Sequence, residues 1–487
     1  MFKNINCKNL PSLRRNIVYQ FLYELLIVFI PLFTIPYVSR VLGAENIGLF
    51  SYTYAVANYF VLFANLGIKN YGRRRTIAMV RNNKEELNRN FSEILSIHII
   101  FSIIVIFVYL VLLFFFVEDN LVIFLIQSIY VFAAVFDINW FFFGIEKFKL
   151  TVGRNTLVKI LSVFLVLVFV KTQTDLWIYA LILALSVFVG QSVVWFALKQ
   201  YVSWRRPSWA NMKQHIRPLF VLFLPILALS LYKYMDKIML GSISSNVQVG
   251  FYENAEKIIN VPMSLIMAFG VVLMPRIANM VTSKDKGEVF KLIDMSMEAV
   301  MLLAIAISFG LAGISFVLAP IFFGYEFEEC GILIMGLAVT VPFMAFANVI
   351  RTQYLIPYKE DKIFVVSLFL GAAVNLIVNI ILIPYMAARG AVIGTIFAEI
   401  IVCIYQSYFV RKKIFIKKYL LNTIPPILIG IVMFVFVFQI GNVMNINIVT
   451  LILQLLVGMF IYAVGVFLLM LKSRTRLMVL LRKFVVR

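Results

Sequence analysis

Acidic residues, histidine and cysteine are scarce in this sequence. Asp and Glu number 23 against 44 Lys and Arg, and these four types together make up only 14% of the 487 residues. Hydrophobic residues make up 63%, and the mean hydropathy is +0.98. A soluble domain has about half apolar and about a quarter charged residues. The composition therefore excludes a soluble globular protein and predicts an all-α polytopic membrane protein.

The few cysteines and histidines exclude two further classes of protein. Cys7, Cys330 and Cys403 are far apart in the sequence, as are His98 and His215, and no CxxC spacing occurs. A disulfide framework or a zinc site requires closer groups of such residues. No stretch is long and polar enough for a soluble domain with clustered carboxylates. We therefore expect no metal, no cofactor and no catalytic residue, and we predict that the chain is not an enzyme.

Long apolar runs are abundant, and each is a candidate membrane span. A helix needs about 20 mostly apolar residues to cross the hydrocarbon core. The first run is expected to be a retained helix, since no small-residue cleavage site follows a short apolar stretch. Three longer connections, 69–92, 199–217 and 276–294, are predicted to be cytoplasmic loops. The fourteen predicted spans are 17–41, 47–68, 93–117, 120–143, 155–171, 176–198, 218–241, 250–275, 295–322, 331–351, 363–384, 389–410, 421–440 and 447–471.

Positive charge alternates between the two ends of these spans. Of the 44 Lys and Arg, 37 lie in alternate connections or next to the first and last spans. The remaining connections hold only Arg40, Lys171 and Arg389. Because cytoplasmic loops of membrane proteins carry the excess of Lys and Arg, both termini and every basic loop are predicted to be cytoplasmic. The net charge of +21 then marks loops beside anionic lipid and not a nucleic-acid-binding surface.

The basic connection 199–217 separates six predicted spans from the rest. We predict an N-terminal lobe (1–198), a cytoplasmic linker (199–217), a C-terminal lobe (218–410) and a last region with two spans and a basic tail (411–487). The linker interleaves Trp204 and Trp209 with basic residues. This pattern suits a segment in the headgroup layer. A solvated linker with two anchoring tryptophans is an equal alternative.

A short glycine pattern recurs in the two predicted lobes. Leu42-Gly43 ends the first span, and Gly48-Leu49-Phe50 opens the second. Leu240-Gly241 ends the seventh span, and Gly250-Phe251-Tyr252 opens the eighth. Glycine at such places permits a tight turn. Recurrence at the same position in both halves is typical of a duplicated transporter.

Several motifs follow one another in order along the chain. They are Pro36-Tyr37-Val38-Ser39-Arg40-Val41-Leu42-Gly43-Ala44-Glu45-Asn46-Ile47-Gly48-Leu49-Phe50, Met235-Asp236-Lys237-Ile238-Met239-Leu240-Gly241 with Gly250-Phe251-Tyr252, Met274-Pro275-Arg276, Gln353-Tyr354-Leu355-Ile356-Pro357, Asn375-Leu376-Ile377-Val378-Asn379-Ile380 with Ile383-Pro384, and Gly390-Ala391-Val392-Ile393-Gly394-Thr395. With fourteen spans, this set resembles the bacterial polysaccharide flippases. These are the O-antigen and capsule repeat-unit exporters of the multidrug/oligosaccharidyl-lipid/polysaccharide (MOP) superfamily.

The resemblance implies a fold, a function and partners. Two six-helix lobes would face each other in a V around a polar cavity, with two further C-terminal helices. The cargo would be an oligosaccharide repeat unit on undecaprenyl diphosphate, moved from the cytoplasmic to the outer leaflet by alternating access for capsule, O-antigen or exopolysaccharide assembly. Implied partners are membrane lipids, H+ or Na+, and polymerase or export machinery, but no nucleic acid. The implied location is the cell (inner or plasma) membrane.

Ionisable residues inside the predicted spans are the main candidates for a site, because they are costly in hydrocarbon and usually face a cavity or a partner. The seventh and eighth spans carry six of them: Lys233, Asp236, Lys237, Glu253, Glu256 and Lys257. Spacings of three and four place such residues near one helix face. They predict a polar patch that meets a diphosphate or a sugar acid. The alternative is a set of ion pairs that neutralise one another and join the two helices.

Five residues complete the candidate site. Arg40 ends the first span and Lys159 lies in the fifth, where either snorkelling or a cavity position is possible. Arg351 and Gln353 end the tenth span on the predicted cytoplasmic side, where an incoming diphosphate would arrive. Glu24, inside the first span, is the predicted group for proton or cation coupling. A hydrogen bond from Glu24 to a neighbouring helix is the alternative role.

Three other functions stay open. A lipid II flippase of the same superfamily shares the layout but brings several arginines into its first two helices, whereas the interior of the first span here offers only Glu24. A cation-coupled multidrug antiporter typically has twelve helices. A membrane polysaccharide polymerase or ligase needs a large outer loop with catalytic residues, and the longest predicted outer connection here has about eight residues.

Overall fold

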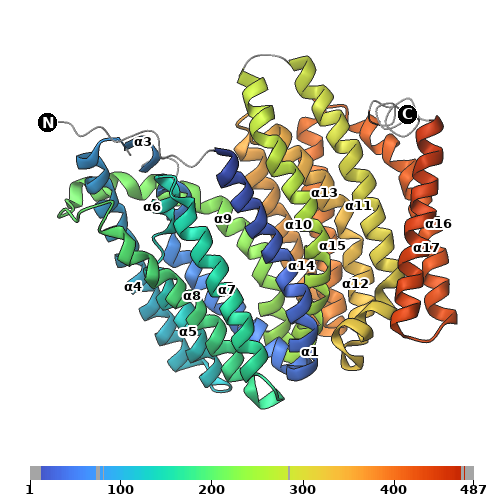
Figure 1. Cartoon of the computed structure of the whole chain (residues 1–487), viewed down its shortest axis with the longest axis horizontal. Coiled ribbons are helices and arrows are strands. Elements are labelled where there is room, and N and C mark those ends of the chain that lie inside the picture. The colour runs from blue at the N-terminus through green and yellow to red at the C-terminus, as the bar shows by residue number, and fades with distance from the viewer. Residues whose placement is uncertain (1–12, 73–76, 81, 283–285, 473–476, 478–487) are drawn as a thin grey trace. The chain divides into compact units, whose positions relative to one another are not determined.

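The computed structural model describes residues 13–72, 77–80, 82–282, 286–472 and 477, without the side chains of 13–32, 78, 148, 149, 152, 232, 282 and 286. Within these ranges every regular element is a helix, as the predicted all-α class requires (Figure 1). The α-helices are α1 (Leu13–Asn65), α2 (Ile68–Tyr71), α3 (Ala78–Val80), α4 (Lys84–Phe116), α5 (Leu121–Val135), α6 (Asn139–Gly144), α7 (Phe148–Phe169), α8 (Leu176–Leu198), α9 (Trp209–Ile243), α10 (Asn246–Thr282), α11 (Lys286–Phe323), α12 (Cys330–Ala338), α13 (Thr340–Ile350), α14 (Asp361–Met386), α15 (Ala388–Val410), α16 (Ile416–Val443) and α17 (Ile448–Lys472). Short 3₁₀ turns occur at η3 (Gln173–Asp175) and η4 (Tyr325–Phe327), and a π-helical turn at η5 (Arg351–Leu355).

Twelve helical segments of the described residues are long and apolar enough to cross a membrane. An α-helix pairs its own backbone N–H and C=O groups, so an apolar helix enters hydrocarbon without unpaired polar groups. The chain is therefore a multi-pass membrane protein. One of the twelve segments is Phe33–Asn65 of α1, and α7 contributes none. The count of fourteen spans and the cytoplasmic termini stay predictions.

The first two predicted spans meet at a kink inside α1. We expected a turn between 17–41 and 47–68, and α1 consists of two helices joined at Gly43, where the backbone leaves the helical conformation. Gly43 has φ 77° and ψ 172°, a conformation that lacks a penalty only for glycine. The glycine thus provides the kink between the two helices.

Helices extend into the three long connections predicted from the sequence, whose cytoplasmic location stays a prediction. The helix α4 already begins at Lys84, inside predicted loop 69–92, and α9 begins at Trp209, inside 199–217. Most of 276–294 belongs to α10 or α11. Lys, Arg and Glu are good helix formers, so a charged stretch ends an apolar span without ending its helix.

The chain forms two compact units. Unit 1 holds residues 1–42 and 52–230, and unit 2 holds 43–51 and 231–487. The division falls within α9, and it places the short segment Gly43–Ser51 of α1 in unit 2. The predicted lobes 1–198 and 218–410, and their arrangement as a V, stay predictions.

Unit 1 is a helical bundle with an aromatic core at one end. The helix α5 packs on α4 and α8, and α8 also packs on α7 (Figure 1). Phe91 stacks on Trp140 with ring centroids 5.6 Å apart and meets the edge of Phe141 at 4.8 Å. All three side chains are buried, so α4 and α6 are fixed to each other here.

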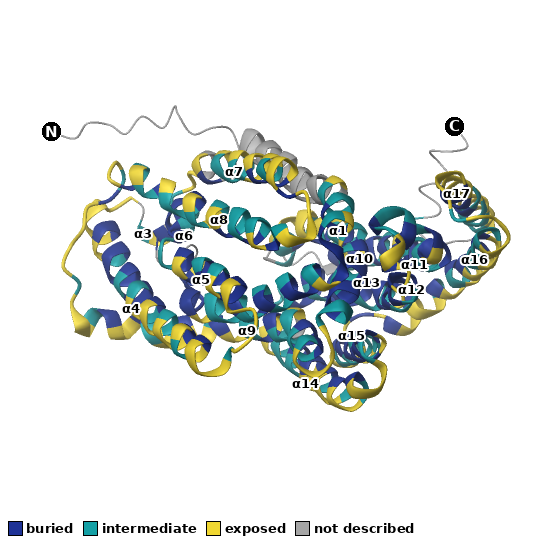
Figure 2. Ribbon diagram, turned by 90° about the horizontal axis from the view of Figure 1, so that it is seen from below, coloured by how far each residue is buried: buried dark blue, intermediate teal, exposed yellow. Residues whose placement is uncertain are grey.

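Unit 2 is built around α11, which packs on α12, α13 and α16. The helices α14 and α15 form a hairpin through the single residue Ala387, and α16 and α17 form a second pair beside α11 (Figure 1). Large apolar side chains stay exposed on α4 of unit 1 and on α16 and α17 of unit 2 (Figure 2). Phe114 is 82% exposed and Phe460 is 70% exposed. Such faces suit contact with lipid tails.

The recurrent glycines of the two halves meet inside unit 2. A Cβ atom on Gly48 would overlap the backbone carbonyl of Asn246, and one on Gly250 would overlap the carbonyl of Ala44. The bend of α1 and the start of α10 therefore cross backbone to backbone. Ala44 also donates its N–H to the Glu326 carboxylate at 2.9 Å. The pattern that the sequence repeats thus provides the two sides of one helix crossing.

Candidate functional site

Three helices of unit 2 bring polar side chains to the carboxylate of Asp236. Asn379 of α14 donates to Asp236 Oδ1 at 2.5 Å, and Tyr252 of α10 donates to Oδ2 at 2.6 Å. Thr395 of α15 donates to the same Oδ2 at 2.9 Å. Asp236 itself, on α9, is only 4% exposed. The result is a buried carboxylate held by three neutral donors.

Among the described residues, the group around Asp236 contains buried amide atoms without hydrogen-bond partners and no cation paired with the carboxylate. Among the described residues, no Lys or Arg lies within ion-pair distance of Asp236. The Asn375 side chain accepts a hydrogen bond from Asn379 at 3.2 Å, but its own Nδ2 is buried without a partner, as is Asn379 Oδ1. Burial of a charged carboxylate without a counter-charge is costly. The site therefore suits a carboxyl group that binds a proton or a cation.

The lysine next in the chain belongs to a separate ion-pair network. Lys237 Nζ lies 2.5 Å from Glu253 and 2.8 Å from Glu256, both on α10. Lys257 lies 3.2 Å from Glu253. The alternative set of ion pairs that joins the seventh and eighth spans is therefore present for four of the six charged residues.

Lys233 and Asp236 stand outside that network, unlike the six-residue patch that the sequence predicted. Lys233 is exposed, and its ammonium group lies 5.4 Å from the ring centre of Tyr234. It forms no ion pair with any described residue. Lys233 lies one helical turn before Asp236 and Lys237, and it is exposed whereas they are buried. Lys233 is thus the cation of this group that is open to an anion.

Arg351 and Gln353 lie in the π-helical turn η5 after α13. Arg351 donates to the Asn348 side chain at 2.6 Å, and its guanidinium lies 5.5 Å from the ring centre of Phe364. Gln353 is fully buried and accepts a hydrogen bond from Ser296 at 2.7 Å. π-Helical turns occur frequently at functional sites. A fully buried Gln353 reaches a ligand only if this turn opens.

The other predicted residues belong to unit 1. Arg40, three residues before the bend of α1, and Lys159, on α7, are both exposed. Glu24 lies in α1, but its side chain is outside the described residues. Asp137, another acid inside a span, is buried and pairs with Lys69 at 2.9 Å.

Tyr252 and Thr395 were not among the residues predicted for the site, although each ends one of the sequence motifs. Asn375 and Asn379 also come from such a motif. One signal in the sequence could have pointed to these residues. Four motifs each carry a polar residue within a predicted span, and these residues are up to 159 positions apart. Their meeting at Asp236 depends on helix packing, which no spacing in the sequence gives.

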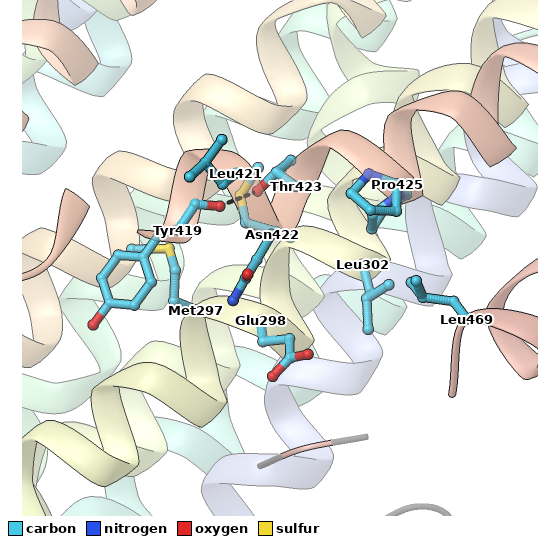
Figure 3. Close-up of a pocket in the computed structure, with 11 residues that line it drawn as sticks. Met297, Glu298, Leu302, Tyr419, Leu421, Asn422, Thr423, Pro425 and Leu469 are labelled. Carbon is cyan, nitrogen blue, oxygen red and sulfur yellow. Dashed lines mark hydrogen bonds between the residues drawn. The ribbon is translucent and has the colours of Figure 1, made fainter. Parts of the chain in front are cut away.

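Two cavities lie among α11, α16 and α17 of unit 2. The smaller, of about 90 Å³, is lined by Glu298, Tyr419 and Asn422 among apolar neighbours (Figure 3). Tyr419 and Thr423 come from the first turns of α16, where the Thr423 hydroxyl donates to the Tyr419 carbonyl at 2.8 Å. The larger cavity, of about 760 Å³, is almost wholly apolar and is lined by α10, α11, α16 and α17. Its chemistry suits hydrocarbon.

Charges within the spans of a multi-pass helical fold mark functional sites and are typical of polytopic membrane transporters. Residues 13–281 match the family described as "Polysaccharide biosynthesis protein", and the chain belongs to this family. The predicted resemblance to bacterial polysaccharide flippases of the MOP superfamily is thereby confirmed.

Known proteins resemble this chain over nearly their full length. A Shigella dysenteriae protein described as an O-antigen transporter is 24% identical over 409 residues, which are 81% of this chain and 99% of that protein. The structure of a lipid II flippase, MurJ, in an inward closed conformation has a TM-score of 0.72 at 16% identity, covering 94% of this chain and 98% of MurJ. An inward-facing MATE family multidrug transporter gives 0.63 at 13% identity, covering 81% and 97%. The fold is therefore of the MATE/MOP type.

Proposed function

We propose that the protein is a flippase for oligosaccharide repeat units linked to undecaprenyl diphosphate. It moves them from the cytoplasmic to the outer leaflet by alternating access, for assembly of capsule, O-antigen or exopolysaccharide. The similarity to an O-antigen transporter, over 99% of that protein's length, carries the proposal. The family match supports a cargo of the polysaccharide pathway. No covalent bond changes in this step, so no catalytic residue is needed.

The cargo sets the requirements for the site. Its lipid tail can stay in the bilayer, but its sugars and diphosphate must cross about 30 Å of hydrocarbon. Lysine and arginine are the usual partners of phosphate groups. We assign first contact with the diphosphate to Lys233, since it is exposed and forms no ion pair with the described residues. Arg40, Lys159, Lys257 and Arg351, with Gln353, are the further candidates along the path.

We propose Asp236 as a coupling group in addition to Glu24. Its burial, its neutral donors and the unpaired amide atoms of Asn375 and Asn379 support this role. A proton on the carboxyl would neutralise the site. Na+ would do the same, because a carboxylate with amide and hydroxyl oxygens provides the oxygen ligands that hard cations prefer. Binding or release of either ion would change the charge that joins four helices.

The proposal includes the topology predicted from the charge pattern. The protein lies in the cell membrane with fourteen spans, both termini in the cytoplasm, two lobes (1–198 and 218–410), a linker (199–217) and a last region (411–487). The alternation of basic and uncharged connections supports it. Polymerase or export machinery on the outer side would take up the flipped repeat unit.

A leaflet-accessibility assay tests the function. Purified protein is reconstituted into liposomes with a fluorescent oligosaccharide on undecaprenyl diphosphate, and the fraction that reaches the opposite leaflet is followed. We expect protein-dependent translocation that is lost in Lys233→Ala but kept in Lys412→Ala/Lys413→Ala, an exposed lysine pair outside the site. If no lipid-linked sugar moves but amphiphilic drugs do, the protein is a multidrug antiporter.

The alternative is a lipid II flippase, which the TM-score of 0.72 with MurJ favours at the level of the fold. The same liposomes can carry lipid II in place of the oligosaccharide. Faster translocation of lipid II than of any oligosaccharide-linked undecaprenyl diphosphate would replace the first proposal by this one.

A further inference from the structure

The linker between α8 and α9 is fastened along α4 of unit 1. We call residues 202–217 the linker strap. Ser203 donates its N–H to Asn88 at 3.0 Å, and Arg205 donates its N–H to Ser92 at 2.9 Å. Asn88 and Ser92 lie four apart, on one face of α4. The non-helical part of the strap therefore follows the axis of α4 and does not hang free in solvent.

The helical part of the strap is fixed by a buried polar chain. The Tyr71 hydroxyl lies 2.6 Å from His215 Nδ1, and His215 Nε2 lies 2.9 Å from the Glu93 carboxylate. Asn211 donates to the other Glu93 oxygen at 3.1 Å. Tyr71, Glu93 and His215 are all buried. A buried carboxylate with these partners holds the strap in one position, because losing any partner would leave a buried charge underbonded.

The strap presents its largest apolar side chains outward. Val202, Met212 and Leu219, at its edge, belong to the buried core of unit 1. By contrast, Trp204 is 55% exposed and Trp209 is 59% exposed. An exposed large aromatic residue on a segment that already has a buried face calls for an explanation.

Cations accompany the two tryptophans on the outward face. Arg205, Arg206, Lys213 and Arg217 are all exposed, and Lys213 lies 5.9 Å from the ring centre of Trp209. The neighbouring first turns of α4 add the exposed Lys84 and Arg89 and the exposed acids Glu85 and Glu86. The cations outnumber the acids, so this face attracts anions.

The depth of the strap follows from the length of α4. A hydrocarbon core of about 30 Å takes roughly 20 helical residues. Counted back from Phe116, these end near Ile97, and the exposed apolar residues of α4 begin at Ile100. Ser92, the partner of Arg205, then lies about 7 Å beyond the core for an untilted helix. The headgroup layer is about 5–8 Å thick on each side.

We propose that the linker strap is a membrane-surface anchor that binds the anionic headgroups of the leaflet on its side. Trp204 and Trp209 lie at the boundary of headgroups and acyl chains, where indole rings are enriched. Arg205, Arg206 and Lys213 bind lipid phosphates, as basic residues beside an anionic leaflet do. The buried chain from Tyr71 to Glu93 keeps the strap in register with this layer, so unit 1 holds a fixed depth in the membrane.

Tryptophan quenching tests the anchor on the whole protein in phosphatidylcholine/phosphatidylglycerol vesicles. The emission of Trp204 and Trp209 is obtained by subtracting the fluorescence of Trp204→Phe/Trp209→Phe from that of the wild type. We expect a nitroxide on the lipid headgroup to quench this emission about twofold more than one deep in the acyl chain. Trp177, exposed at the start of α8, provides a matched single-Phe control. Quenching by aqueous iodide without quenching by the headgroup nitroxide would overturn the proposal. The linker strap would then be a solvated linker or a protein-docking surface.

The lipid charge is tested by composition. Replacement of phosphatidylglycerol with phosphatidylcholine is expected to lower headgroup quenching in the wild type. In Arg205→Ala/Arg206→Ala this dependence should disappear, whereas Lys412→Ala/Lys413→Ala, another exposed basic pair, should keep it. A dependence that survives loss of both arginines would contradict their role.

The buried chain is tested by His215→Phe, which keeps a ring and removes both hydrogen bonds. We expect at least twofold more iodide quenching of Trp204 and Trp209. If this variant does not fold, Asn88→Ala removes one strap contact only. Unchanged quenching in both variants would show that these contacts do not hold the strap. These readouts need no transport, so they stand or fall independently of the proposed flippase activity.

Discussion

Asp236 joins four helices by hydrogen bonds, so the result of replacing it depends on the new side chain. Asp236→Asn keeps the shape and removes the titratable charge. We expect this variant to fold but to lose the dependence of transport on pH or Na+. Asp236→Leu also removes the acceptor of Asn379 and should lower the free energy of unfolding by about 1–3 kcal/mol. Melting curves and transport at several pH values and Na+ concentrations measure both. Wild-type ion dependence in Asp236→Asn would move the coupling role to Glu24.

Lys237 and Lys233 should separate stability from transport. Lys237→Met leaves the partly buried Glu253 and Glu256 without their shared cation, and breaking a buried pair costs about 3–5 kcal/mol. Lys233→Met removes an exposed cation and should change stability by less than about 0.5 kcal/mol while lowering transport.

The matched control keeps the network neutral. Lys237→Met/Glu253→Gln removes one charge of each sign and should recover part of the lost stability in a melting experiment. If Lys237→Met melts at the wild-type temperature, the network does not stabilise unit 2. If Lys233→Met transports normally, the diphosphate contact lies elsewhere.

At the scale of helices, the crossing of α1 and α10 has no room for side chains. We expect Gly48→Leu or Gly250→Leu to destabilise unit 2 by about 1–3 kcal/mol or more, because a Cβ atom would already overlap the opposing backbone. Gly153, on α7, has no heavy atom within 4 Å of an added Cβ, so Gly153→Leu is the control. Thermal melting of the three variants in one detergent gives the comparison. Equal melting temperatures would mean that the crossing opens readily.

The helices were predictable where composition alone decides, and not where packing decides. Apolar length is enough to place α14 and α15, whose spans were expected at 363–384 and 389–410 and are observed at Asp361–Met386 and Ala388–Val410. The helical character of 276–294 was missed because hydropathy reports where a span leaves hydrocarbon and not where its helix ends. The break between the first two spans was predictable, because Leu42-Gly43 marks it and the backbone leaves the helical conformation at Gly43.

The sequence predicted several residues of the candidate site, but it did not predict which of them contact one another. Charge inside a span pointed to Asp236 and Lys237 alike, since both are costly in hydrocarbon. They are adjacent in sequence, yet one bonds to Tyr252, Asn379 and Thr395 and the other to two glutamates. This division depends on which helix packs against each side of α9. A single sequence does not give the packing partners of a helix.

For the whole molecule, the charge of the cargo makes the membrane potential a driving force. Moving two negative charges from the cytoplasmic to the outer side gains about 2.3 kcal/mol per charge for each 100 mV of inside-negative potential. The sum, about 4.6 kcal/mol, would shift the equilibrium between leaflets by a factor of about a thousand or more if both charges cross the full potential. A basic path, such as Lys233 and Arg40, lowers the barrier without changing this equilibrium.

We therefore expect outward translocation in liposomes to depend on the sign of an imposed potential. With a potassium gradient and valinomycin, an inside-negative potential should raise the rate and the final outward fraction, and the opposite sign should lower both. A lipid-linked oligosaccharide on a monophosphate carries less charge and should respond less. If the potential has no effect on the diphosphate cargo, compensating cations cross with it, and the site at Asp236 is the first place to look for them. A response in Asp236→Asn equal to that of the wild type would instead show that the cargo alone carries the charge.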